Sequence, residues 1–327
     1  MTTTVTVASI DDALGPGAQR FFGSGYKRVS QSLADLRPTA GGLTAAASIR
    51  YPPDWSRKSR DAELVPHLST IDALVLGVRL VETHLVHTFR LTARQRTRMW
   101  LRRCTMKSGA APQEQLADFT VEVRLVETRR DPDALCGNVS RFDCRIGRIK
   151  VPYEVEHPGA EPFPAGGDIG AEASTGSRYW VDGYKERVHH IGNLLVDVEA
   201  RRAEAGVAVV PAARADVDLA AAYDPALTMV DCTVVMAQLA QALLYRVDGI
   251  ERGRSNTLWM RRIDMAAPTP YQPLANPFTI STTVVRDRLL SLAGGTWRAS
   301  DFVGDCQGFH VAYSLAHQLP TTQGEQQ

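Results

Sequence analysis

The sequence predicts an α+β fold built from two tandem copies of one domain, in which an antiparallel sheet wraps a long buried helix. Three observations support this prediction. The chain repeats itself at a nearly constant offset of 159 residues, which is the spacing of Pro52 and Pro211. Each copy contains one long apolar segment with helical periodicity. Segments that alternate between apolar and polar residues, as antiparallel strands do, follow each of these helices.

The repeat spans residues 21–157 and 179–317. Ordered matches run through both copies with only single-residue shifts, and each copy is far longer than the roughly 20 to 50 residues of a solenoid unit. We therefore interpret the repeat as a duplicated domain. The clearest matches are Gly25-Tyr26-Lys27 with Gly183-Tyr184-Lys185, Leu68-Ser69-Thr70-Ile71-Asp72 with Leu227-Thr228-Met229-Val230-Asp231, and Trp100-Leu101-Arg102-Arg103 with Trp259-Met260-Arg261-Arg262.

Composition limits the class of protein. A chain of 327 residues is long enough for two domains that each bury a core. Its net charge of +1 creates no field that would attract nucleic acid or an anionic membrane, so we expect neither as a partner. The N-terminus carries no signal-peptide pattern and no run of about 18 apolar residues is present, so we expect a cytoplasmic protein.

The segments outside the two copies differ in composition. Residues 1–20 are expected to form a short leader, residues 158–178 a linker rich in Pro, Gly and Ala, and residues 318–327 a flexible tail. The five cysteines form no CxxC pair and are odd in number, which favours reduced thiols that pack in the core. No cluster has the spacing of zinc ligands, so we predict no metal and no cofactor.

Within each copy a strand comes first, over residues 43–51 or 205–210, and ends at Pro52 or Pro211. A polar stretch then leads to the apolar helix. Its apolar residues face most sides, which is typical of a helix that is buried on several faces. They are Ile71, Leu74, Val75, Val78, Val81 and Leu85 in the first copy and Cys232, Val235, Met236, Leu239 and Leu243 in the second.

Alternating strands follow the helix over residues 119–125 and 278–284, and again over residues 149–155 and 309–315. One long helix with four or more strands, most of them after it, is a pattern in which the sheet can wrap the helix. This is the hotdog arrangement, so the prediction is a tandem duplicated hotdog, or double hotdog. By analogy, the two halves pair about a pseudo-twofold axis and leave ligand channels between them.

The two predicted helix starts are the first candidate site. Ser69-x-x-Asp72 and Thr228-x-x-Asp231 have the spacing of a capping box, in which the hydroxyl and the acid satisfy the first amides of the helix. In the functional interpretation, the unpaired amides near Ser69, Thr70 and Asp231 polarise a thioester carbonyl or hold an oxyanion. Both interpretations can hold at once.

His67 precedes the first helix, and its counterpart in the second copy is Ala226. A neutral imidazole beside a helix start and a carboxylate can act as a general base. We therefore predict His67 and Asp72 as catalytic residues, with Asp72 orienting His67. The alternative is a structural histidine.

A Trp followed by two Arg residues occurs once in each copy. These arginines either reach out to solvent from a buried indole or bind a phosphate or carboxylate of the substrate, which a guanidinium can do with two parallel hydrogen bonds. For the second alternative we assign Arg102, Arg103 and Arg261 to substrate binding.

Three segments of the first copy resemble the avirulence D (AvrD) family of bacterial proteins, and the resemblance covers most of the chain. The resemblance implies a role in making small diffusible acyl-sugar elicitors, the syringolides. It also implies that a β-ketoacyl chain is joined to a five-carbon ketose. The segments are Phe21-Phe22-Gly23-Ser24-Gly25-Tyr26-Lys27-Arg28-Val29, Trp55-Ser56-Arg57-Lys58 and Pro66-His67-Leu68-Ser69-Thr70-Ile71-Asp72-Ala73-Leu74.

The leading functional hypothesis is an acyltransferase or condensing enzyme that takes a β-ketoacyl thioester, carried on acyl carrier protein or CoA, and joins it to a small polyol. The product would be an acyl sugar or a butenolide-like metabolite. A hotdog dehydratase or thioesterase is an alternative, and a non-catalytic protein that binds an acyl ligand is another. The oligomeric state stays open, with a homo-oligomer among the options.

Overall fold

The computed structural model describes residues 4–58, 64–159, 177–255, 258–274, 276–292 and 294–320. The first copy contains β2 (Ser30–Thr39), β3 (Gly42–Arg50), α2 (Thr70–Phe89), α3 (Ala93–Arg98), β4 (Trp100–Lys107), β5 (Phe119–Arg130), β6 (Asn138–Ile146), β7 (Ile149–Lys150) and β8 (Tyr153–His157). The second contains α4 (Tyr184–Glu186), β9 (Val188–Asp197), β10 (Arg202–Val210), α5 (Met229–Asp248), β11 (Trp259–Ala266), β12 (Phe278–Leu292), β13 (Gly295–Cys306) and β14 (Phe309–Gln318). Two elements precede both copies, β1 (Thr4–Ser9) and α1 (Ile10–Leu14).

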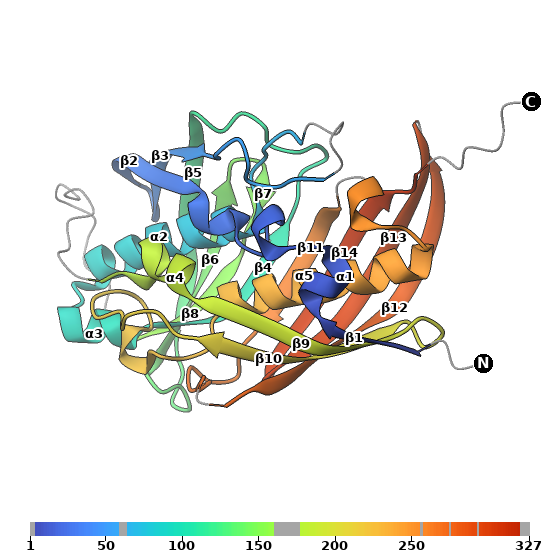
Figure 1. The fold of residues 1–327 in the computed structure, drawn as a ribbon. Helices are drawn as coiled ribbons and strands as arrows, with labels where there is room; N and C mark the ends of the chain where they lie inside the picture. Colours follow the sequence, from blue (N-terminus) through green and yellow to red (C-terminus); the bar gives the residue numbers. More distant parts are fainter. Residues whose placement is uncertain are drawn as a thin grey trace, which may run out of the picture.

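The strands of the two copies follow the same order. It is β2-β3-β5-β6-β8-β4 in the first copy and β9-β10-β12-β13-β14-β11 in the second. The strands at the inner edges of the two copies, β4 and β11, pair with each other in antiparallel fashion, with Cys104 opposite Met265. The halves therefore form one continuous antiparallel sheet against which both long helices pack (Figure 1). The predicted double hotdog is confirmed.

Both long helices begin with the predicted capping box. Ser69 and Thr228 are the N-caps, and each hydroxyl accepts from the amide three residues later, at Asp72 or Asp231. Each helix has 20 residues and ends in a left-handed residue, Arg90 after α2 and Gly249 after α5. Because the sheet and the other half cover them, most of their residues are buried, as the apolar pattern predicts.

The two copies pack their helices differently. At Gly77 of α2 a β-carbon would lie 2.3 Å from the hydroxyl of Tyr153, which donates hydrogen bonds to the carbonyls of Ala73 and Leu74. In α5 the larger Met236 takes the place of Gly77, and the glycine is in the sheet instead, where a β-carbon on Gly304 would lie 2.1 Å from Met236 Cε. The duplication therefore preserves the fold and changes the space beside each helix.

The residues ahead of the copies belong to the core fold. β1 pairs with β9, with Val5 opposite Val196, and α1 packs on α5 (Figure 1). We expected a short leader here, and the pairing of β1 with β9 gave no local signal because the paired residues lie almost 200 positions apart. Most of the predicted linker and tail lies outside the described residues. Within the described part of the chain, no helix is long and apolar enough to cross a membrane.

Candidate active site at the start of the first long helix

Asp72 organises the start of α2 from inside the protein. Its side chain is buried and accepts hydrogen bonds from the Gln31 side-chain amide (2.8 Å), the Ser69 hydroxyl (2.6 Å), the Ser69 amide (3.1 Å) and the Tyr51 hydroxyl. Burial and the charge of Asp72 both raise the pKa of Tyr51, so Tyr51 remains a neutral donor. The carboxylate is thus fully used in fixing Tyr51 and the N-cap.

His67 lies close to the helix start but does not contact Asp72. Its Nδ1 is 3.2 Å from the carbonyl oxygen of Val65, and among the described residues no hydrogen bond joins its ring to Asp72. A direct contact by which Asp72 would orient the His67 ring is therefore absent from the described residues, and the donors to Asp72 are Gln31, Tyr51 and Ser69. The ring packs instead against Trp259, with centroids 5.1 Å apart, and against Trp55, with centroids 6.2 Å apart in a T-shaped arrangement.

This arrangement determines which atom of His67 is basic. A proton on Nδ1 satisfies the Val65 carbonyl, and this tautomer leaves Nε2 as an acceptor. His67, Ser69 and Thr70 all line the same cavity. Within the part of the chain that the structure describes, the amides of Thr70 and Ile71 have no acceptor, as expected for the first turn of a helix. The imidazole of His67 and the first residues of α2 therefore both border the cavity.

The cavity has a volume of about 700 Å³ and receives walls from both copies. The first copy supplies the α2 start and the loop of residues 108–113, and the second supplies α5 and strands β11 to β14. Much of the lining is apolar and aromatic, which suits an acyl chain. The apolar part includes Phe21, Phe22, Trp55, Met236, Tyr245, Leu258, Trp259, Leu290, Trp297, Tyr313 and Leu315.

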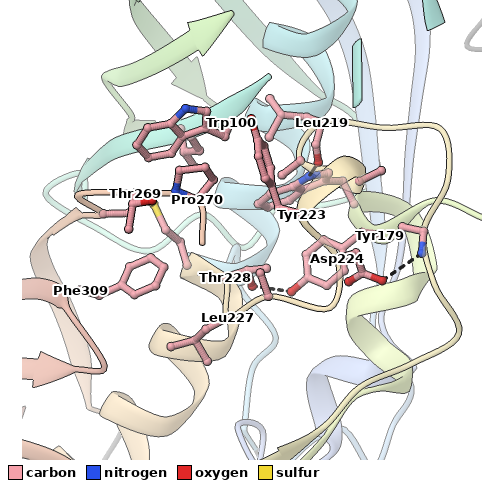
Figure 2. A pocket seen from close by; sticks show the side chains of 18 of the residues that line it. Trp100, Tyr179, Leu219, Tyr223, Asp224, Leu227, Thr228, Thr269, Pro270 and Phe309 are labelled. Carbon is pink, nitrogen blue, oxygen red and sulfur yellow. Dashed lines mark hydrogen bonds between the residues drawn. The ribbon is translucent and has the colours of Figure 1, made fainter. Parts of the chain in front are cut away.

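The corresponding position at the start of α5 has a much smaller cavity. Its cavity measures about 60 Å³ and is lined by Trp100, Leu219, Tyr223 and Thr228, among others. Figure 2 shows the rings of Tyr179, Tyr223 and Trp100 around this helix start, with a hydrogen bond between the Tyr179 and Thr228 hydroxyl groups. Residues between β10 and α5 therefore fill the space that stays open beside α2.

Asp231 is part of a buried ion pair. It contacts Arg187 at 2.5 Å and His189 Nε2 at 2.8 Å, and Arg187 also contacts Asp224 at 2.9 Å. Burial opposes the charged form of Asp231, but Arg187 and His189 outweigh it and hold the pKa of this carboxyl below its usual value. Asp231 is absent from the lining of either cavity, which makes the substrate-binding role that we assigned to it hard to reconcile with its position.

The predicted arginines separate into two groups. Arg102 lies within 3.5 to 3.6 Å of Asp131, Glu154 and Glu156, and Arg103 makes two hydrogen bonds to Asp264. Neither lines a described cavity. Arg261 does line the large cavity. The structure therefore brings His67, Ser69, Thr70 and Arg261 together and leaves Arg102 and Arg103 in ion pairs elsewhere.

Several residues of the site gave no usable sequence signal. The loop of residues 108–113 reaches the site because the Gln113 carbonyl accepts from the Leu68 amide at 2.8 Å. Arg148 follows β6 and lines the same cavity. Both positions depend on contacts between distant segments. Only the small residues of Ser108-Gly109-Ala110-Ala111 hint at a close approach to a ligand.

The fold and the site define a double-hotdog protein with a large cavity at the start of α2. The AvrD family, described as Pseudomonas avirulence D protein, matches residues 5–320. The chain therefore belongs to the AvrD family. No curated protein matches it.

Solved structures resemble the chain over most of its length. A protein of unknown function with a hot dog fold from Alicyclobacillus acidocaldarius is 11% identical, with a TM-score of 0.42, over 88% of this chain and 97% of its own. The acyl-CoA thioesterase II TesB2 from Mycobacterium marinum is 12% identical, with a TM-score of 0.37, over 88% and 97%. A dehydratase studied for the borrelidin and fluvirucin polyketide synthases is 11% identical, with a TM-score of 0.32, over 87% and 92%.

Proposed function

We propose that this protein is an acyltransferase of the cytoplasm that joins a β-ketoacyl group from a thioester to the hydroxyl of a small polyol. The observation that carries the proposal is the cavity of about 700 Å³, which is largely apolar and is bordered by His67 and the start of α2. Such a cavity suits the acyl chain, and the helix start suits the carbonyl carbon that reacts. Membership of the AvrD family supports a small acyl-sugar or butenolide-like product.

The proposed reaction uses His67 as general base. Nε2 removes the proton of the polyol hydroxyl, and the resulting alkoxide attacks the thioester carbonyl. The amides of Thr70 and Ile71 donate to the oxyanion that forms. The C–S bond then breaks, the imidazolium returns its proton to the leaving thiolate, and an ester and a free thiol result.

Asp72 has an indirect part in this proposal. It fixes Ser69 and Tyr51, and Tyr51 also donates to the carbonyl of His67 at 3.0 Å. The His67 main chain and the helix start are thus held by one carboxylate. We therefore propose Asp72 as a positioning residue, and Arg261 as the substrate-binding arginine of the original set.

The test is mass spectrometry of small molecules in a host that expresses the protein and receives β-ketoacyl precursors. We expect a new acyl ester that is absent when the host expresses the His67→Ala variant. With purified protein, a β-ketoacyl thioester and candidate polyols should yield the same ester and one equivalent of thiol.

The same assay separates the alternatives. Release of thiol and free acid without a polyol would indicate a thioesterase, and loss of water from a 3-hydroxyacyl thioester would indicate a dehydratase. Tight binding of an acyl thioester with no turnover under any condition would indicate a non-catalytic binding protein.

A further inference from the structure

The charged residues that line the large cavity are of one sign. Arg20, Lys58, Arg148, Arg252 and Arg261 line it, and among the described residues no Asp or Glu does. The chain as a whole has a net charge of only +1. A cavity wall with this excess of cations attracts an anionic ligand.

Three of these cations are tied into the protein. Arg20 pairs with Asp11 and with the Gln238 side chain. Lys58 donates to the carbonyl and hydroxyl of Ser255. Arg252 joins separate segments by donating to the carbonyls of Arg57 and Gln19. These contacts account for their placement without a ligand.

Arg148 and Arg261 are different. Arg261 makes one long contact, 3.3 Å from Nη1 to the Gly109 carbonyl, and Arg148 makes one of 3.4 Å from Nη1 to the Pro112 carbonyl. Among the described residues both make these contacts to main-chain carbonyls and neither has a carboxylate partner, and both are exposed. The two guanidinium groups thus come from different copies and contact the two ends of the same short loop.

That loop adds further donors. Ser108 is fixed to β11 by its amide, which donates to the Arg261 carbonyl at 3.1 Å. In the described part of the chain, the amides of Gly109, Ala110 and Ala111 have no acceptor, and all three residues line the cavity. A β-carbon on Gly109 would lie 3.2 Å from Arg148 Cβ, so the glycine lets the loop approach the arginine.

We propose that Arg148, Arg261 and the loop of residues 108–112 form a phosphate-binding site at the rim of the cavity. Paired guanidinium groups and small-residue backbone amides are the donors that suit a phosphate group. The loop leads through Gln113 to Leu68, so the site adjoins the start of α2. The phosphate comes either from a phosphopantetheine carrier or from a phosphorylated polyol. This inference rests on the proposed function for the identity of these two ligands.

The test measures binding without turnover, so that it stands apart from the catalytic proposal. Trp55, Trp259 and Trp297 line the cavity, and their fluorescence reports on a ligand that enters it. CoA, pantetheine and glycerol 3-phosphate are titrated separately against the intact protein. If the carrier supplies the phosphate, CoA binds at least tenfold more tightly than pantetheine, and added salt weakens the binding of CoA but not that of pantetheine. If the acceptor supplies it, glycerol 3-phosphate binds more tightly than glycerol and CoA shows no preference.

Variants connect the result to the two arginines. Arg148→Gln and Arg261→Gln should each weaken the binding of the phosphate-bearing ligand about tenfold, because each removes a charge-assisted hydrogen bond. The affinity for pantetheine should not change. Arg145→Gln and Arg262→Gln are matched controls, because both residues are exposed close by and neither lines the cavity. They should bind like the unmodified protein. The proposal is overturned if neither phosphate ligand binds better than its phosphate-free analogue, or if the control variants lose as much affinity.

Discussion

At the scale of single residues, the difference between His67 and Ala226 separates the two helix starts. His67 lines the large cavity, whereas Ala226 lines the small one. The Val65 carbonyl fixes the His67 tautomer, and the Trp259 ring holds the imidazole in place. These contacts are the kind that prepare a neutral histidine for proton transfer.

The first prediction concerns His67→Ala. General-base assistance typically contributes about 10² to 10⁴-fold, so kcat should fall by that order in the ester-forming assay. Circular dichroism and the fluorescence response to an acyl ligand should change little, because the side chain is half-buried at the cavity wall. His190→Ala, at an exposed site outside the described cavities, is the control. Full activity of the His67 variant would exclude it as the base.

The second prediction compares the acids of the two capping boxes by urea unfolding. Asp231→Asn leaves Arg187 buried without its closest charge partner, so we expect a loss of about 3 to 5 kcal/mol. Asp72→Asn replaces a carboxylate whose described hydrogen-bond donors are all neutral, so no buried charge loses its partner and the change should cost only about 1 to 2 kcal/mol. Equal losses in the two variants would show that the ion pair adds nothing beyond the cap.

At the scale of elements, a buried acidic pair fixes the segment that closes the second helix start. Glu82 of α2 accepts from the Leu219 amide at 2.7 Å, and Asp218 accepts from the Trp180 amide at 2.9 Å. Asp218 Oδ1 is buried without a hydrogen-bond partner. Burial, together with the charge of Glu82, raises the pKa of Asp218 to about 7.

The third prediction follows from this pKa. A carboxyl that keeps its proton in the folded state and loses it near pH 4 when unfolded makes the protein less stable as the pH rises between these values. The unfolding free energy of the unmodified protein should therefore fall, relative to Asp218→Asn, from pH 4 to about pH 7 and then level off. Denaturant unfolding of both proteins across this range measures the difference. Asp216→Asn, at an exposed position, is the control. The difference in unfolding free energy between this variant and the unmodified protein should not change with pH in this way.

The helices could be predicted from the sequence more readily than the contacts between distant segments. The helix starts at Thr70 and Met229 follow from local chemistry, because a capping box and an apolar period are written within a few residues. The pairing of β1 with β9 and the position of Arg148 and Arg261 on one cavity depend on contacts between distant segments, which leave no local pattern. The arginines show that equivalent positions in the repeat can have different surroundings. Arg102 and Arg261 match in sequence, but Arg102 lies beside carboxylates and Arg261 lines the large cavity.

At the scale of the whole molecule, duplication has produced one continuous sheet with two unequal helix starts. The first has a cavity of about 700 Å³ and the second one of about 60 Å³. The N-terminal segments cross between the halves, since Tyr26 and Tyr184 stack with centroids 6.3 Å apart and Lys27 donates to the Arg187 carbonyl. Each half thus supports the other, and neither copy alone would contain the complete site.

The last prediction tests this inequality by filling each cavity. Ala237 lies on α5 and lines the large cavity, so Ala237→Phe should place a ring where the acyl chain binds and reduce activity at least tenfold. Ala226→Val enlarges a side chain at the small cavity and should leave turnover within about twofold of the unmodified protein. Thermal unfolding of both variants shows whether the fold is retained, since overpacking typically costs about 1 to 3 kcal/mol. If the two folded variants lose activity equally, both helix starts take part in the reaction, and the single-site mechanism has to be abandoned.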